Sequence, residues 1–243
     1  MLILELWMGR LGNNIIQLSN MIDIALEYKV NICLNRPHPL FNVTVIEKYF
    51  DTYKCSKNKK MVNIFYYKEK LPFPLKIYNN NKQERNKLLY SAFLIKDIEK
   101  LHVNDLVIHI RSGDIFSSRP HPNYIPPPLS YYTKEINKHN YRKIIIVCED
   151  TINPVVNKLL ELYKNAFYKK NTLIDDIKII LGATNIIASV GTFIPSLLLI
   201  SNNNENLHTT DCDKENLEKY YEIMKPWLNT PKQRSFILTY NPD

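Results

Sequence analysis

Glycine is scarce in this sequence: its 243 residues include only five glycines, against 14 prolines and 16 tyrosines. That count excludes collagen-like and glycine-rich flexible chains. The chain also lacks the run of roughly 20 apolar residues that a transmembrane helix needs. Its best candidate, residues 186–200, is interrupted by polar residues, a glycine and a proline. The first residues lack the basic and apolar regions of a signal peptide. We therefore expect a folded chain without an integral membrane segment.

Cysteine is rare too, with four residues scattered along the chain at Cys33, Cys55, Cys148 and Cys212. No pair has the CxxC spacing, and no histidine stands at metal-ligand spacing from any of them. This pattern favours reduced, mostly buried thiols over disulfides or a zinc site. It predicts a reducing compartment, the cytoplasm, and the host cytoplasm if the source is viral.

Basic residues outnumber acidic ones by 32 to 24, for a net charge of +8, in an otherwise ordinary globular composition. Such an excess suits an anionic partner: a nucleic acid, a membrane surface or a phosphorylated small molecule. No RRM, KH or OB signature is present, and the basic residues are spread along the chain. We therefore expect no nucleic-acid partner. A basic nucleic-acid- or nucleotide-binding protein without catalysis remains the alternative class.

Short apolar runs alternate with segments of helical spacing, the pattern of an α/β fold. The first half predicts strands at residues 2–7, 30–34, 43–46 and 61–67, and helices at 13–28 and 81–100. The second half predicts strands at residues 106–110, 143–148 and 186–188, and helices at 130–139, 151–163, 175–182, 192–201 and 214–224. We expect two Rossmann-like domains, residues 1–102 and 103–243.

Four of the five glycines, Gly9, Gly12, Gly113 and Gly191, stand in loops that follow predicted strands. Glycine permits positive φ angles and lets a ligand approach the backbone. Because ligands of open α/β sheets bind outside the carboxyl ends of the strands, these loops are the expected binding region. The first loop, Gly9-Arg10-Leu11-Gly12-Asn13, opens a helix whose free N–H groups can face an anion.

The segment His109-Ile110-Arg111-Ser112-Gly113-Asp114 carries the strongest chemical signal. An arginine at the exit of a buried strand, close to a glycine, can present its guanidinium bidentately to a diphosphate. His109 comes two residues earlier and therefore points to the same side of the strand as Arg111. Asp114 can hold the arginine fork or act as an acid or base.

A third loop, Ser189-Val190-Gly191-Thr192-Phe193, offers hydroxyls and helix N-terminal amides to phosphate oxygens. One helix earlier, Asp175 and Asp176 stand where helix N-caps are common, and spacing alone favours that role. One of them can instead accept a hydrogen bond from a purine base.

Together these loops resemble the three motifs of the superfamily of α1,2-, α1,6- and protein O-fucosyltransferases, especially its bacterial and viral α1,2-type members. The resemblance spans nearly the whole chain in the expected order, and its HxRxGD element is specific. It implies a GT-B fold, with two Rossmann-like domains facing each other across a cleft. The acceptor belongs to the N-terminal domain and the nucleotide sugar to the C-terminal one. It also implies a GDP-fucose donor, an oligosaccharide acceptor, inversion at the anomeric carbon and no required metal or other cofactor.

The resemblance also assigns donor-binding roles. Arg111 matches the arginine that holds the β-phosphate, and His109 and Asp176 match positions that contact guanine. The matching phosphate-contacting loop comprises Ser189, Gly191, Thr192 and Phe193, and the matching first-loop site comprises Gly9, Gly12 and Asn13. One departure is Ser112, where many relatives carry a second arginine. This departure leaves another GDP- or UDP-linked sugar as an alternative donor.

The expected reaction is an in-line displacement by an acceptor hydroxyl at C1 of the donor sugar. Arg111, loop amides and helix N-termini stabilise the departing GDP in this scheme, as a divalent cation does in other glycosyltransferases. A base must deprotonate the acceptor, and Asp114 and His121 are both candidates. The loop at residues 119–132, rich in proline and tyrosine, either shapes an acceptor cleft or is a rigid connector.

Asp211-Cys212-Asp213 is a DxD sequence, the metal motif of GT-A glycosyltransferases. It follows a polar run and precedes a predicted helix. That context favours a helix cap or a solvated loop over a metal site. We therefore expect no metal ligand at these positions.

Overall fold

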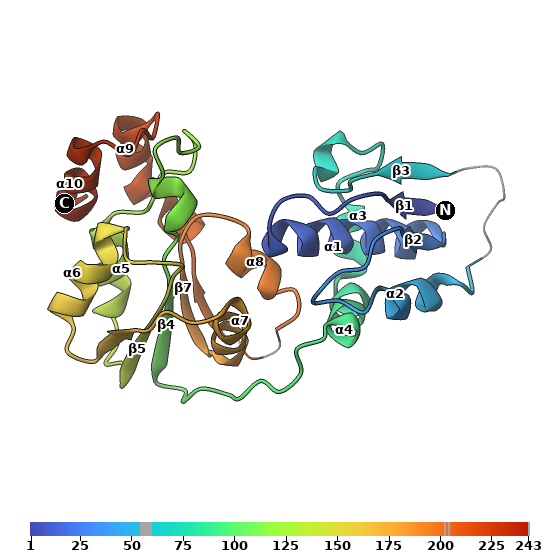
Figure 1. The fold of residues 1–243 in the computed structure, drawn as a ribbon, viewed down its shortest axis with the longest axis horizontal. Helices are drawn as coiled ribbons and strands as arrows, with labels where there is room; N and C mark the ends of the chain where they lie inside the picture. Colours follow the sequence, from blue (N-terminus) through green and yellow to red (C-terminus); the bar gives the residue numbers. More distant parts are fainter. Residues whose placement is uncertain (54–59, 202, 204, 243) are drawn as a thin grey trace. The chain divides into compact units, whose positions relative to one another are not determined.

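The computed structural model describes residues 1–53, 60–201, 203 and 205–242. The chain divides into two compact units (Figure 1): unit 1 is Met1–Asp97 with Thr192–Asn202, and unit 2 is Ile98–Gly191 with Asn203–Asp243. Each unit has a parallel sheet, which confirms the predicted α/β class and its two Rossmann-like halves. No helix in the described part of the chain is both long and apolar enough to cross a bilayer. Cys55 lies outside the described residues, and the other three cysteines are free thiols.

Unit 1 is built around one long helix. Its sheet has the order β2-β1-β3, from strands β1 (Leu2–Leu4), β2 (Ile32–Leu34) and β3 (Met61–Asn63). Helix α1 (Leu11–Tyr28) connects β1 to β2, and 14 of its 18 residues are buried, so it is the core element. It packs against α3 (Ile77–Asn80), α4 (Lys82–Ala92) and α8 (Phe193–Leu197).

Two predictions for unit 1 are wrong. Residues 43–46 form the start of helix α2 (Val43–Phe50), not a strand. The β-branched run suggested a strand, but Ile46 and Phe50 lie one helical turn apart and both are buried. The helix predicted at 81–100 ends at Ala92, because Phe93 turns extended and packs its ring against Phe41, with ring centroids 5.2 Å apart.

The sheet of unit 2 has five parallel strands in the order β6-β5-β4-β7-β8. They are β4 (Asp105–His109), β5 (Lys143–Val147), β6 (Ala166–Tyr168), β7 (Asn185–Ala188) and β8 (Asn206–His208). His109, the last residue of the central strand, pairs with Val147 on one side and Ala188 on the other. The loops that follow β4, β5 and β7 therefore leave the same edge of the sheet.

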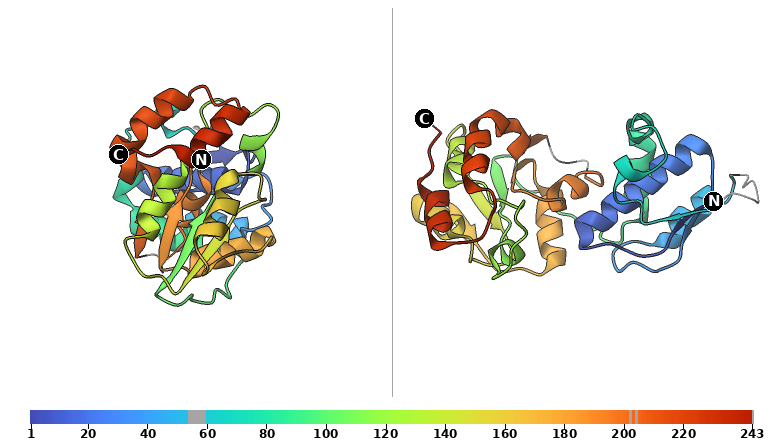
Figure 2. Two further views of the ribbon diagram at one scale, coloured as in Figure 1. Left: turned by 90° about the vertical axis from the view of Figure 1, so that its left-hand side faces the viewer. Right: turned by 90° about the horizontal axis from the view of Figure 1, so that it is seen from above.

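Four helices of unit 2 share one large core with the sheet: α5 (Leu129–Ile136), α6 (Pro154–Leu162), α9 (Lys214–Met224) and α10 (Pro231–Thr239). Helix α7 (Leu173–Gly182) covers the other face (Figures 1 and 2). The sequence reading missed β6 and α10. Helix α10 nevertheless carries a clear start signal, a capping box between Thr230 and Gln233 with Pro231 at its first position.

Candidate functional site

Arg111 lies in the loop just after the central strand β4, where Asp114 holds its side chain. Its Nε donates to Asp114 Oδ1 at 3.3 Å, and its Nη2 donates to Asp114 Oδ2 at 3.0 Å. The arginine side chain is 21% exposed and the aspartate 41% exposed, so the pair is open to solvent on one side. The bidentate geometry fixes the plane of the guanidinium. It also leaves Nη1 as the nitrogen that Asp114 does not occupy.

An aromatic ring lies under the same guanidinium. Arg111 Cζ is 4.1 Å from the centroid of the Tyr124 ring, a close cation–π contact. The exposed His121 lies beside that tyrosine, with ring centroids 4.9 Å apart, and its Nδ1 accepts from Asn123 N at 3.3 Å. The three predicted catalytic residues therefore gather in unit 2. Tyr124, which the sequence reading did not single out, connects His121 to Arg111.

Gly191 forms the third side of the guanidinium pocket. Its φ is +115°, and a Cβ at this position would lie only 2.6 Å from Arg111 Nη1. Glycine is therefore required both by the backbone conformation and by the close approach of the arginine. Ser189, two residues earlier, donates its backbone N–H to His109 O at 3.1 Å, which continues the pairing of β4 with β7.

Contacts with neighbouring segments hold the turn that carries Gly113 and Asp114 in place. Gly113 has φ +58°, and a Cβ there would overlap the Glu149 carboxylate after β5. The 3₁₀ turn Gly113–Phe116 is held by the fully buried Trp227, whose Nε1 donates to Ile115 O at 2.6 Å. These contacts set the position of Asp114, and through it the orientation of the Arg111 fork.

Ser112 occupies a structural position. It is 1% exposed, its Oγ donates to Asp150 Oδ1, and it accepts from Asn153 N at 3.1 Å. Asn153 in turn caps helix α6 and donates its side-chain amide to Arg111 O at 3.0 Å. The side chain at position 112 therefore ties the loops after β4 and β5 together, away from solvent.

The two residues matched to base contacts differ in their surroundings. Burial, followed by the nearby charge of Arg111, lowers the pKa of His109 to about 4, so the imidazole is neutral near pH 7. Burial also raises the pKa of Asp176, whose Oδ1 accepts from Asn171 Nδ2 at 3.0 Å.

The predicted capping role of Asp175 and Asp176 is wrong. Thr172 is the N-cap of α7, and its Oγ1 accepts from Asp175 N at 3.2 Å.

The remaining donor-site candidates lie together in unit 1. Gly9 has φ +66°, and a Cβ on Gly12 would lie 2.7 Å from Thr192 Oγ1. Asn13 Oδ1 accepts from Thr192 Oγ1 at 2.7 Å. The same Cβ on Gly12 would lie 2.9 Å from the backbone nitrogen of Phe193. The close packing of α1 on α8 thus depends on a glycine at position 12.

A buried polar chain that the sequence reading missed fixes the first loop. His38 Nδ1 accepts from Leu40 N at 3.1 Å, so its Nε2 carries the proton and donates to Asn14 Oδ1 at 3.2 Å. Asn14 Nδ2 donates to Met8 O at 2.8 Å, and Met8 N donates to Gln17 Oε1 at 2.8 Å. Burial lowers the pKa of His38 to about 4, which keeps this tautomer neutral. The available signal was the three-residue spacing of amide side chains, at Asn14, Gln17 and Asn20, in an otherwise apolar helix.

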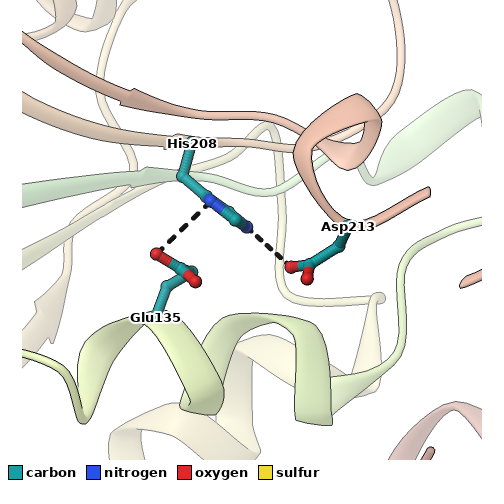
Figure 3. A group of neighbouring side chains, drawn as sticks. All are labelled: Glu135, His208 and Asp213. Carbon is teal, nitrogen blue, oxygen red and sulfur yellow. Dashed lines mark hydrogen bonds and ion pairs between the residues drawn. The ribbon is translucent and has the colours of Figure 1, made fainter. Parts of the chain in front are cut away.

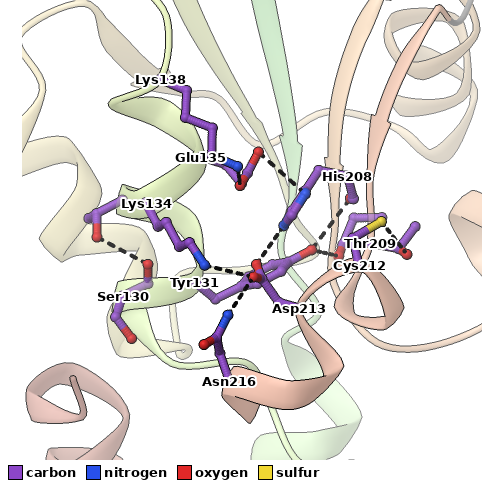
Figure 4. A network of polar contacts seen from close by, with 12 residues as sticks. Ser130, Tyr131, Lys134, Glu135, Lys138, His208, Thr209, Cys212, Asp213 and Asn216 are labelled. Carbon is purple, nitrogen blue, oxygen red and sulfur yellow. Dashed lines mark hydrogen bonds and ion pairs between the residues drawn. The ribbon is translucent and has the colours of Figure 1, made fainter. Parts of the chain in front are cut away.

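A second polar cluster in unit 2 contains the last residue of the DxD sequence. Figure 3 shows His208 between Glu135 and Asp213, with Nδ1 3.3 Å from Glu135 Oε2 and Nε2 2.8 Å from Asp213 Oδ2. One ligand atom from each residue lies within 4.8 Å of the others, a composition suited to a cation. Lysines already supply positive charge there: Lys134 Nζ lies 2.9 Å from Asp213 Oδ1, and Lys138 pairs with Glu135 (Figure 4).

The Asp213 carboxylate is therefore already paired with side chains of the protein itself. Burial alone would raise its pKa, but hydrogen bonds from Lys134, Asn216 and His208 outweigh burial and hold the pKa below its usual range. Glu135 and His208 also border a groove of about 600 Å³, which extends from His208 to the amino ends of β4, β7 and β8. Arg111, Tyr124 and Gly191 do not line this groove, so it is separate from the guanidinium pocket.

Comparisons with known proteins return structural similarity alone. No family model and no curated protein sequence matches this chain. A crystal structure of POFUT1 in complex with GDP is similar at a TM-score of 0.48 and 10% identity, covering 86% of this chain and 97% of that one. A crystal structure of the NodZ alpha-1,6-fucosyltransferase soaked with GDP-fucose is similar at a TM-score of 0.41 and 10% identity, covering 82% and 92%. POFUT1 is a protein O-fucosyltransferase, and NodZ is an alpha-1,6-fucosyltransferase.

Proposed function

We propose that this chain is an inverting glycosyltransferase of the GT-B type that transfers fucose from GDP-fucose to a hydroxyl of a glycan acceptor. The observation that carries the proposal is the setting of Arg111 within the HxRxGD segment. Asp114 orients the guanidinium, Tyr124 covers one face of it, and Gly191 leaves room at Nη1. An arginine held this way at the carboxyl end of a central parallel strand is prepared to bind a diphosphate.

The diphosphate is the leaving group in this reaction. The acceptor oxygen forms a bond to C1 of the sugar while the bond from C1 to the β-phosphate oxygen breaks, and GDP departs with the electron pair. Negative charge grows on the β-phosphate as that bond lengthens. A positive group fixed beforehand beside it lowers the barrier, because it needs no reorganisation during the reaction. We assign this role to Arg111.

The proton of the acceptor hydroxyl must pass to a base. Both carboxylate oxygens of Asp114 accept from Arg111, which favours a positioning role for Asp114. His121 is exposed beside Tyr124, and we assign it as the candidate base. For guanine, we propose neutral His109 and the carboxylate of Asp176 as contacts. The phosphate contacts proposed on the same resemblance are Ser189, Gly191, Thr192, Phe193 and the first-loop residues Gly9, Gly12 and Asn13.

We also propose that the reaction needs no metal. Arg111 supplies a fixed positive charge where a metal-dependent enzyme places a cation. The only carboxylate of the DxD sequence that is buried, Asp213, is already engaged by Lys134 and His208. Chelation with EDTA is therefore expected to leave donor binding and transfer unchanged.

A thermal-shift panel with GDP, UDP, ADP and CDP, each with and without EDTA, tests the proposal. A ligand at a hundred times its Kd stabilises the folded chain by about 2.7 kcal/mol, which is readily detected. We expect stabilisation by GDP that survives EDTA and is lost in Arg111→Ala. Arg119→Ala, an exposed arginine in the same loop, is the matched control and should respond to GDP like the unmodified chain.

The panel also separates the alternatives. Selective stabilisation by UDP, or a requirement for metal, would contradict the assigned donor and favour another nucleotide sugar. No response to any nucleotide would favour a binding protein without catalysis. If GDP stabilises the chain, incubation with GDP-fucose and other GDP-sugars, followed by measurement of free GDP, identifies the sugar that is cleaved.

A further inference from the structure

The positive charge of this protein is concentrated in one of its two units. Unit 1 contains 15 lysines and arginines against 8 acidic residues, a net charge of +7. Unit 2 contains 17 against 16, a net charge of +1. Arg111, the one charged residue among the proposed phosphate contacts, belongs to unit 2, so the donor does not account for the excess in unit 1. Unit 1 therefore has an electrostatic preference of its own for an anionic partner.

One exposed segment of unit 1 combines lysines with aromatic and aliphatic side chains. It spans residues 66–76, between β3 and α3, and reads YYKEKLPFPLK; we name it the lysine–aromatic segment. It contains the 3₁₀ turn Lys68–Lys70, and Figure 2 shows it beside α1. Two buried side chains anchor it, Leu71 at 7% exposure and Ile77 just beyond its end at 1%.

The side chains between and before these anchors face solvent. Tyr67 is 46% exposed and Leu75 is 53% exposed, so neither side chain belongs to the core of unit 1. The Phe73 ring packs against Tyr28, itself 46% exposed, with ring centroids 5.1 Å apart. Lys68, Lys70 and Lys76 are exposed around them, and Lys70 Nζ lies 4.4 Å from the centroid of the Tyr67 ring. Glu69 is the single acidic residue of the segment.

This mixture matches the chemistry of a membrane interface. Lysines attract anionic headgroups, while tyrosine, phenylalanine and leucine insert at the boundary between headgroups and acyl chains. A nucleic acid would bind the lysines through its phosphates and stack its bases on the tyrosines. The exposed Leu75, between Pro74 and Lys76, offers nothing to bases or phosphates. Charge complementarity and exposed apolar side chains together favour lipid.

We propose that the lysine–aromatic segment docks unit 1 on an anionic membrane surface. Binding of this kind is peripheral and reversible, with the segment lying at the headgroup level. Each lysine near such a surface is worth about fivefold in partitioning, which corresponds to about 1 kcal/mol, so three lysines together account for about a hundredfold. The inference stands independently of the proposed transferase activity, since it rests on unit 1 alone.

Co-sedimentation of the full chain with vesicles tests it. The vesicles are phosphatidylcholine alone or phosphatidylcholine with 30% phosphatidylglycerol, at low salt and at 0.5 M salt. We expect binding to the anionic vesicles only, weakened by salt. The charge variant K68Q/K70Q/K76Q should lose about a hundredfold in partitioning. The apolar variant Leu75→Ser should lose severalfold, a loss that remains at high salt. Circular dichroism checks that every variant is folded.

The matched control is K164Q/K169Q/K170Q, which removes the same charge from three exposed lysines of unit 2. It should bind anionic vesicles like the unmodified chain. Equal losses in the two triple variants would overturn the proposal, because they would show that net charge alone drives binding. So would failure to bind anionic vesicles, or tighter binding to a single-stranded oligonucleotide that the segment variant loses, which would identify a nucleic acid as the partner.

Discussion

Replacing Gly191 with alanine tests how the guanidinium pocket is built. A Cβ at residue 191 would lie 2.6 Å from Arg111 Nη1, whereas an ordinary van der Waals contact begins at 3.4 Å. The guanidinium must therefore retreat by at least about 0.8 Å. That movement lengthens its hydrogen bonds to Asp114, now 3.0 and 3.3 Å, and shifts it over Tyr124.

Two separate costs follow from Gly191→Ala. A φ of +115° is a conformation that alanine rarely adopts, which costs about 1–3 kcal/mol of folding free energy. For a chain of this size, that lowers Tm by about 2–4 °C per kcal/mol. The displaced guanidinium also loses a charge-assisted hydrogen bond to the diphosphate, worth about 1.5–3 kcal/mol, so GDP affinity should fall about 10- to 150-fold.

Calorimetric titration of GDP into four proteins separates the two costs: the unmodified chain, Gly191→Ala, Arg111→Ala and the double variant. If Gly191 acts through Arg111, the double variant should bind GDP no more weakly than Arg111→Ala, while its Tm still falls. Additive losses of affinity in the double variant would refute the reasoning. So would a folded Gly191→Ala that binds GDP as tightly as the unmodified chain.

Three further predictions follow from single contacts. Tyr124→Leu should weaken GDP binding about 2- to 30-fold by calorimetry, because a cation–π contact worth about 0.5–2 kcal/mol is lost, whereas Tyr124→Phe should not. His38 should make the free energy of unfolding fall by up to about 3 kcal/mol as the pH drops from 6.5 towards 4. The pKa of His38 in the folded chain, about 4, lies below its value in the unfolded chain, so the unfolded chain takes up the proton first. In urea titrations at several pH values, His38→Gln should remove this contribution and leave the similar one from His109, whose pKa burial also lowers to about 4. Ser112→Arg should lower Tm without strengthening GDP binding, because it buries a charge beside Asn153 and removes a hydrogen bond to Asp150; unchanged stability would contradict the buried role of Ser112.

The sequence predicts the central strands well and the marginal elements poorly. Strands β4 and β5 lie within one residue of their predicted ranges, because buried parallel strands are continuous apolar runs. Strand β6 is only three half-buried residues long, which is too short for any periodic signal. Residues 43–46 are a run of β-branched side chains at the start of α2, where burial of Phe50 decides for the helix.

The candidate site was predictable where one short motif contains it. Arg111 and Asp114 lie three residues apart, and their pairing follows from that spacing. Tyr124 reaches the guanidinium across a proline-rich loop whose path depends on Trp227, over a hundred residues further along the chain. The chain of hydrogen bonds from His38 through Asn14 to the first loop likewise joins the segment after β2 to α1 by a tertiary contact. Sequence periodicity does not encode such contacts.

The central claim is that Arg111 binds the β-phosphate of a guanine nucleotide. Its most direct test compares GDP with GMP, which lacks that phosphate, by calorimetry on the unmodified chain and on Arg111→Ala. We expect the unmodified chain to bind GDP about 10- to 150-fold more tightly than GMP, the worth of one charge-assisted hydrogen bond. Arg111→Ala should bind the two nucleotides about equally, with its affinity for GMP unchanged. An Arg111→Ala variant that still prefers GDP by the same factor would contradict the claim.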